Sequence, residues 1–99
     1  MVIVGGVFEV RPEERDRFLV EHHDAMRRSR AEPGCLEYTF SADPLDPGRV
    51  LLFERWESQE LLDQHLAGLQ GSAPSPDEVA PLSVSITFYD VAGERPFVR

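Results

Sequence analysis

Apolar side chains fall on both faces of the strands that this sequence predicts. The clearest case is the predicted strand over residues 49–57. One of its faces carries Val50, Leu52 and Trp56, and the other carries Leu51 and Phe53. Successive side chains of a strand point to opposite faces, so a sheet with one solvated face alternates apolar with polar residues. Residues 2–10 and 82–92 repeat the two-sided pattern. Both faces of the predicted sheet therefore need cover.

The predicted elements follow the order strand, helix, strand, strand, helix, strand. The strands are residues 2–10, 35–42, 49–57 and 82–92, and the helices are residues 12–31 and 59–67. Pro12 suits the first turn of the first helix, and Glu32-Pro33-Gly34 ends it. This order predicts an α+β, ferredoxin-like βαββαβ fold, in which two helices cover one face of a four-stranded antiparallel sheet. We expect one domain over residues 1–99.

Two segments read as irregular. Residues 68–81 contain glycine and prolines, which interrupt regular structure, at Gly71, Pro74, Pro76 and Pro81. This segment would be either a lid over a pocket or a plain connector, with an optional helical turn at residues 77–80. Residues 93–99 are expected to form an extended arm.

A second copy of the chain is the simplest cover for the sheet face that the helices leave bare. A chain of 99 residues buries only about two thirds of its unfolded surface, so it gains stability from association. Twofold symmetry is the default for such an assembly. We therefore expect a homodimer that forms through the sheet face.

Composition excludes several classes of partner. The net charge is −8 and lysine is absent, which argues against binding to nucleic acid or to an anionic membrane. No apolar run approaches the roughly 18 residues of a membrane span. Cys35 is the single cysteine, so there is no disulfide framework, and we expect a reducing, cytoplasmic setting.

Each predicted helix carries one histidine within its apolar stripe. His22 shares a face with Phe18 and Met26, and His65 shares a face with Leu62 and Leu69. Strand residues Glu54 and Trp56 are two apart, so they lie on one face of the sheet. If that face is the helix side, two imidazoles, a carboxylate and an indole meet in one pocket. The alternative for each histidine is a satisfied core residue. No HxH, HxxxH or HExxH spacing is present, so we predict no metal site.

Several short stretches together resemble the antibiotic biosynthesis monooxygenase family. They are Pro33-Gly34-Cys35-Leu36-Glu37-Tyr38, Asp43 to Gly48, Leu52-Phe53-Glu54-Arg55-Trp56-Glu57-Ser58 and His65-Leu66. The resemblance covers most of the chain. It implies a dimeric α/β barrel, with one pocket per subunit between sheet and helices.

The resemblance also implies an activity. Relatives oxidise electron-rich aromatic polyketides, anthrones or quinols with O2 and use no metal, flavin or haem, so no cofactor is expected. Such an oxidoreductase needs a dry apolar pocket, a base and donors that stabilise the developing anion. We predict His65, His22 and Trp56 as catalytic residues, the histidines serving as base and proton shuttle. The predicted substrate-binding residues are Glu54, Phe8 and Tyr38.

The sequence departs from parts of this family, and other functions stay open. A haem-degrading branch uses an asparagine on the first strand and a tryptophan on the second helix, whereas this chain has no asparagine and places His65 at the tryptophan position. Haem degradation is therefore disfavoured. The alternatives to a monooxygenase are a ligand-binding or accessory dimer without catalysis, and an isomerase or cyclase that uses histidine acid–base chemistry.

Overall fold

Four strands form one antiparallel sheet in a computed structural model that describes residues 1–69 and 75–98. The strands are β1 (Val2–Glu9), β2 (Cys35–Ala42), β3 (Arg49–Trp56) and β4 (Ser83–Asp90), in the spatial order β2-β3-β1-β4. β1 lies in the centre, and its Val4 pairs with Glu54 of β3 and with Phe88 of β4. The predicted ferredoxin-like fold is confirmed. No helix within the described residues is long and apolar enough to span a membrane.

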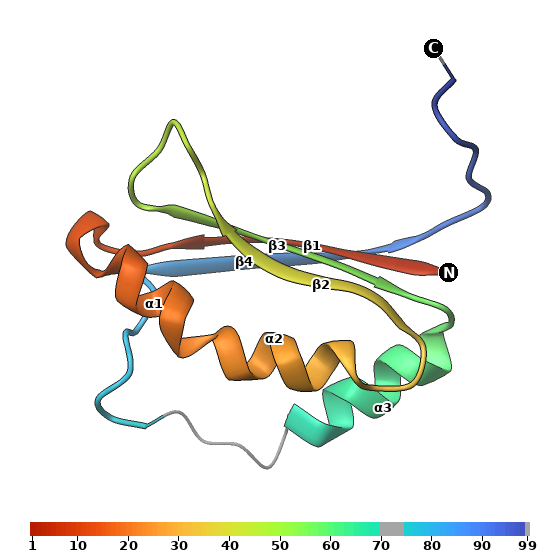
Figure 1. Cartoon of the computed structure of the whole chain (residues 1–99), viewed down its shortest axis with the longest axis horizontal. Helices are drawn as coiled ribbons and strands as arrows, with labels where there is room; N and C mark the ends of the chain where they lie inside the picture. Colours follow the sequence, from red (N-terminus) through yellow and green to blue (C-terminus); the bar gives the residue numbers. More distant parts are fainter. Residues whose placement is uncertain (70–74, 99) are drawn as a thin grey trace.

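All the helices lie on one side of the sheet (Figure 1). They are η1 (Pro12–Glu14), α1 (Arg15–Glu21), α2 (His23–Arg30) and α3 (Gln59–Leu69). Their contacts fall mainly on β2 and β3. α3 extends two residues beyond the predicted end, residues 70–74 of the predicted loop lie outside the described residues, and residues 75–80 form a turn rather than a helix.

The prediction of one continuous helix over residues 12–31 was wrong, because the chain leaves helical geometry at His22. In a regular helix the backbone N–H of His22 would donate to the carbonyl of Phe18. Here the His22 side chain takes that carbonyl, with Nδ1 lying 2.7 Å from it, and the backbone N–H bonds to Leu19 instead. Competition of this kind between a side chain and the backbone interrupts helices.

Two local signals fix the position of α3 against the rest of the molecule. The Ser58 hydroxyl accepts a hydrogen bond from the Leu61 backbone N–H, as expected of an N-cap. Gly34, between α2 and β2, has a φ of +81°, and a Cβ there would overlap the Leu61 side chain. The absent side chain therefore lets the α2–β2 connection lie directly against α3.

The core lies between the helices and one face of the sheet. Its most completely buried side chains are Val4, Val50 and Trp56 from the sheet and Phe18 and Leu62 from the helices. β4 is an edge strand that packs less closely against the helices than β2 does, and Val84, Ile86 and Phe88 are about half exposed on the helix side. Ile86 and Phe88 of this exposed strand line the opening of a cavity between the sheet and the helices.

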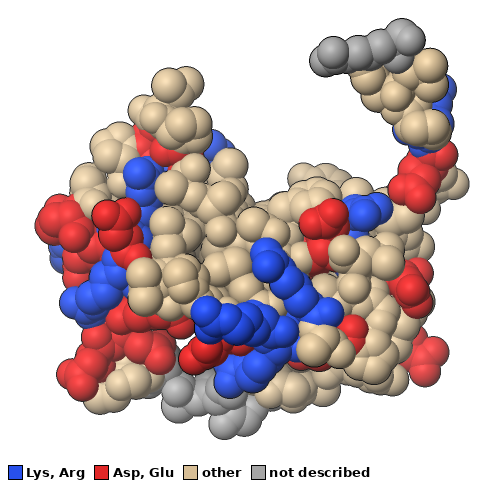
Figure 2. Space-filling model, viewed as in Figure 1, with Lys and Arg blue, Asp and Glu red and all other residues tan. Residues whose placement is uncertain are grey.

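The opposite face of the sheet is bare and partly apolar, as the two-sided pattern predicts. Its apolar side chains include Ile3, Val7, Leu51, Phe53 and Tyr89. Phe53 and Tyr89 are 43% and 54% exposed. The β2–β3 connection and the C-terminal arm rise from opposite ends of this face, and Figure 2 shows an open hollow between them.

Candidate functional site

A cavity of about 330 Å³ lies between α2, α3 and the helix-facing side of the sheet. Ten of its fourteen lining residues are apolar; the exceptions are His22, Tyr38, Glu54 and His65. Ile86 and Phe88 line it from β4, and Leu69 lines it from the end of α3. These three side chains are about half exposed, so they mark the opening. The cavity has the size and polarity of a site for a small organic molecule.

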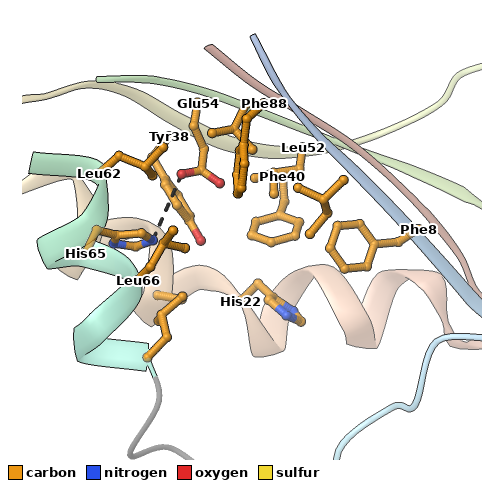
Figure 3. Close-up of a pocket in the computed structure, with 14 residues that line it drawn as sticks. Phe8, His22, Tyr38, Phe40, Leu52, Glu54, Leu62, His65, Leu66 and Phe88 are labelled. Carbon is orange, nitrogen blue, oxygen red and sulfur yellow. Dashed lines mark ion pairs between the residues drawn. The ribbon is translucent and has the colours of Figure 1, made fainter. Parts of the chain in front are cut away.

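His65 is the most constrained polar group of the cavity. α3 carries it into the core, where its side chain keeps only 1% of its surface exposed. Its Nδ1 lies 2.8 Å from Oε2 of Glu32, and its Nε2 lies 4.0 Å from Oε1 of Glu54. Figure 3 shows the ring and the Glu54 carboxylate pointing toward each other across one end of the cavity. The imidazole therefore stands between two carboxylates.

Glu54 and Trp56 lie on the helix-facing side of β3, two residues apart. The indole Nε1–H of Trp56 donates to Oε1 of Glu54 at 2.8 Å. Burial raises the pKa of the Glu54 carboxyl, and the bond from Trp56 and the nearby His65 partly oppose that rise. Trp56 itself is fully buried behind the cavity, with its ring centroid 4.7 Å from that of His65. It supports the two polar groups and does not line the space.

Tyr38 completes this end of the cavity from β2. Its ring meets the His65 ring edge to face, with centroids 5.5 Å apart. Burial, together with the neighbouring Glu54 carboxylate, raises the pKa of Tyr38 to about 12. Its hydroxyl is therefore a neutral group near physiological pH, able to donate a hydrogen bond.

The other end of the cavity is built from aromatic rings. The His22 ring lies 4.2 Å from that of Phe18 and 4.6 Å from that of Phe40, measured between centroids. Phe8 packs against both of those phenylalanines. Because the Phe18 carbonyl can only accept, His22 Nδ1 carries the proton of their bond. In Figure 3, His22 lies on the helix beside Phe40, away from His65 and Glu54.

The structure thus brings five of the six predicted site residues to the cavity wall, with Trp56 directly behind it. It does not bring the two histidines together as one constellation. Sequence reasoning missed Glu32, which precedes His65 by 33 residues and meets it only through the tertiary fold. No group of three metal-ligating side chains is present within residues 1–69 and 75–98.

Comparison with known proteins gives a family match over most of the chain. Residues 1–70 match the family model described as antibiotic biosynthesis monooxygenase. The uncharacterized protein sll1783 of Synechocystis is 33% identical over 64 residues, which are 65% of this chain and 44% of that protein. The chain therefore spans less than half the length of this relative.

Two further relatives match over most of their length. YcnE of Bacillus subtilis, named as a candidate monooxygenase, is 28% identical over 88 residues, which cover 85% of this chain and 93% of that protein. The crystal structure of a candidate antibiotic biosynthesis monooxygenase from Deinococcus radiodurans aligns with a TM-score of 0.73 at 26% identity. That alignment covers 100% of this chain and 99% of the other.

Proposed function

The chain belongs to the antibiotic biosynthesis monooxygenase family, and from that premise we propose that it oxidises a small phenolic, quinol or polyketide-type aromatic with O2. The observation that carries the proposal is His65, held at the wall of an apolar cavity between two carboxylates. An imidazole held in this way can accept a proton from a bound substrate at its free ring nitrogen.

The substrate itself supplies the electrons in this reaction, so no cofactor is required. Loss of a proton from an anthrone or a phenol leaves an electron-rich anion that reduces O2. In the anthrone case a CH2 group becomes a C=O group, one oxygen atom enters the product and the other leaves as water. The four electrons lost by the carbon are those that O2 gains.

His65 is the proposed base, and its neighbours define where the acidic oxygen of the substrate sits. The 4.0 Å between His65 Nε2 and Glu54 Oε1 lets one ligand oxygen lie within hydrogen-bond reach of both atoms. The apolar lining keeps water from the anion and strengthens each polar contact made to it. Tyr38 is proposed as a donor to that anion, and Phe8 and His22 are proposed to contact the far side of the substrate.

A second reaction class uses the same groups without O2. Because burial raises the pKa of Glu54, its carboxyl is better able to hold and return a proton than an exposed carboxyl. A base and an acid within 4.0 Å of each other suit an isomerase or a cyclase. Dependence on O2 separates this reaction from the first.

We further propose that a second copy of the chain covers the bare sheet face. The apolar residues of that face, the hollow that the β2–β3 connection and the arm border, and the small size of the chain support this assembly. Phe53→Glu should convert the dimer to a monomer by light scattering at micromolar concentration. Val20→Glu, at an exposed site on α1, is the matched control. A wild-type monomer would contradict the assembly.

Oxygen uptake tests the main proposal. The purified protein is given a panel of hydroquinones and anthrones, with a metal chelator present, and His65→Ala is run beside it. We expect uptake above the uncatalysed rate that resists the chelator and is lost in the variant. Conversion of a panel member under argon would favour the isomerase or cyclase, and binding without any conversion would favour a ligand-binding role.

A further inference from the structure

Glu32 lies outside the cavity but contacts the imidazole that we place in the chemistry. It follows the C-terminal end of α2, and its Oε2 lies 2.8 Å from His65 Nδ1. The Glu32 side chain keeps 36% of its surface exposed, whereas the His65 side chain keeps 1%. A carboxylate that reaches water therefore holds the outer nitrogen of a ring whose inner nitrogen points toward Glu54.

A second hollow lies on this outer side of His65. It holds about 260 Å³ between α2 and α3, and Arg28, Ser29 and Glu32 share its wall with His65. His65 also lines the inner cavity, and it is the polar one among the described residues that line both spaces. The His65 ring thus lies between the two spaces, with Glu32 on the side of the outer hollow and Glu54 on the side of the inner cavity.

The contact with Glu32 determines which ring nitrogen carries the proton. An ionised carboxylate can only accept hydrogen bonds, so a neutral imidazole bonded to it keeps its hydrogen on Nδ1. The lone pair is then on Nε2, the nitrogen that faces the inner cavity. When Nε2 takes a proton, the resulting imidazolium lies beside a negative charge.

We propose that Glu32 is a positioning residue that fixes His65 in the Nδ1-protonated tautomer and stabilises its imidazolium form. For catalysis the inference rests on the proposed function. The substrate O–H or C–H bond breaks, its proton bonds to Nε2, and the substrate anion keeps the electron pair. Nε2 returns this proton to the outer oxygen of the substrate hydroperoxide. That oxygen leaves as water when the O–O bond breaks and the same carbon gives up its second hydrogen as a proton, so His65 regains its starting tautomer.

Other charged and titratable groups among the described residues also lie near the ring. Glu54 faces it from β3, Tyr38 from β2, and Arg28 shares the outer hollow from α2. Of these groups, Glu54 also lies near Nε2, but at 4.0 Å it makes no direct hydrogen bond. The direct bond to Glu32 therefore decides the tautomer.

Nitrogen NMR of the His65 ring tests the tautomer without any substrate. We expect the wild type to carry its proton on Nδ1. Glu32→Gln should weaken this preference, because a neutral amide can either donate to Nδ1 or accept from it, whereas an ionised carboxylate can only accept. Glu60→Gln, an exposed change of the same kind in the first turn of α3, is the control and should match the wild type. The same proportion of the Nδ1-protonated tautomer in the wild type and in Glu32→Gln would overturn the proposal.

Oxygen uptake by Glu32→Ala tests the catalytic consequence. We expect kcat to fall at least about tenfold with little change in KM, as for other residues that orient a reacting group. Acetate should restore part of kcat, because the outer hollow gives a small carboxylate access to Nδ1. A loss that acetate leaves unchanged would assign Glu32 a merely structural role and overturn the proposal. If the wild type oxidises no panel member, the proposed function fails while the NMR result still decides the role of Glu32.

Discussion

The two ends of the cavity hold the same residue type in opposite surroundings. At one end, His65 lies between Glu32 and Glu54. At the other end, His22 lies among phenylalanine rings and bonds to a backbone carbonyl of its own helix. Both histidines sit on apolar helix faces, yet among the described residues only the ring of the first is hydrogen-bonded to a carboxylate. The groups that hydrogen-bond to a buried imidazole decide whether it can act as a base. The apolar pattern of the helix sequence does not reveal those groups.

The largest expected effect is on oxygen uptake, and it is measured by replacing the histidine at each end of the cavity with phenylalanine. Phenylalanine keeps an aromatic ring and removes both ring nitrogens. His65→Phe should lower kcat/KM for oxygen uptake by about 100-fold or more, the range for loss of a general base. His22→Phe should lower it by less than about tenfold, because that ring contributes mainly packing. Equal losses in the two variants would show that the ends do not differ in chemistry.

The second comparison concerns stability, measured by urea unfolding at one fixed protein concentration. Trp56→Phe removes the indole donor and leaves the buried Glu54 oxygen without it, which should cost about 3 kcal/mol. Phe18→Leu, at the uncharged end, changes only the packing and should cost about 1 kcal/mol. A smaller cost for Trp56→Phe than for Phe18→Leu would mean that the hydrogen bond adds little.

The sequence predicts the fold well because its signals are local. The strand limits differ from the observed ones by at most two residues, since turn residues and alternating apolar positions mark them. The two-residue spacing also places Glu54 and Trp56 on one face. Glu32 could not be predicted, since its contact with His65 depends on how Gly34 lets the connection approach α3. The break at His22 was missed because it arises from one side-chain hydrogen bond.

A third, smaller effect is expected at the helix break. His22→Leu frees the Phe18 carbonyl to accept the backbone N–H of residue 22, so α1 and α2 should join into one helix. The variant loses the bond from the ring to Phe18, and the backbone N–H of residue 22 exchanges its bond to Leu19 for one to Phe18. The net loss of one neutral hydrogen bond should lower the free energy of unfolding by about 1 kcal/mol. Far-ultraviolet circular dichroism and amide NMR shifts at residues 20–24 measure the change. An unaltered break would assign it to packing against the sheet.

The smallest effect should be confined to one pH range and to the charged end. Below its ordinary pKa of 4.5, the Glu54 carboxyl is protonated in both folded and unfolded chains. Above that pH the unfolded chain loses this proton first, because burial raises the pKa in the folded state. The carboxyl therefore lowers the free energy of unfolding as pH rises, until the folded state also ionises. Glutamine does not titrate. The melting temperature of Glu54→Gln should therefore rise relative to that of the wild type as the pH increases through this range.

Phe8→Leu, at the uncharged end, is the matched variant for this measurement. Phe8 contacts Phe18 and Phe40, so its replacement should shift the melting temperature by the same amount at each pH. Glu60→Gln, which removes an exposed carboxyl, accounts for the change in overall charge. If the difference between Glu54→Gln and the wild type stayed constant with pH, the Trp56 and His65 contacts would fully offset burial. Glu54 would then be an ordinary ionised partner of His65, and only the base would distinguish the two ends of the cavity.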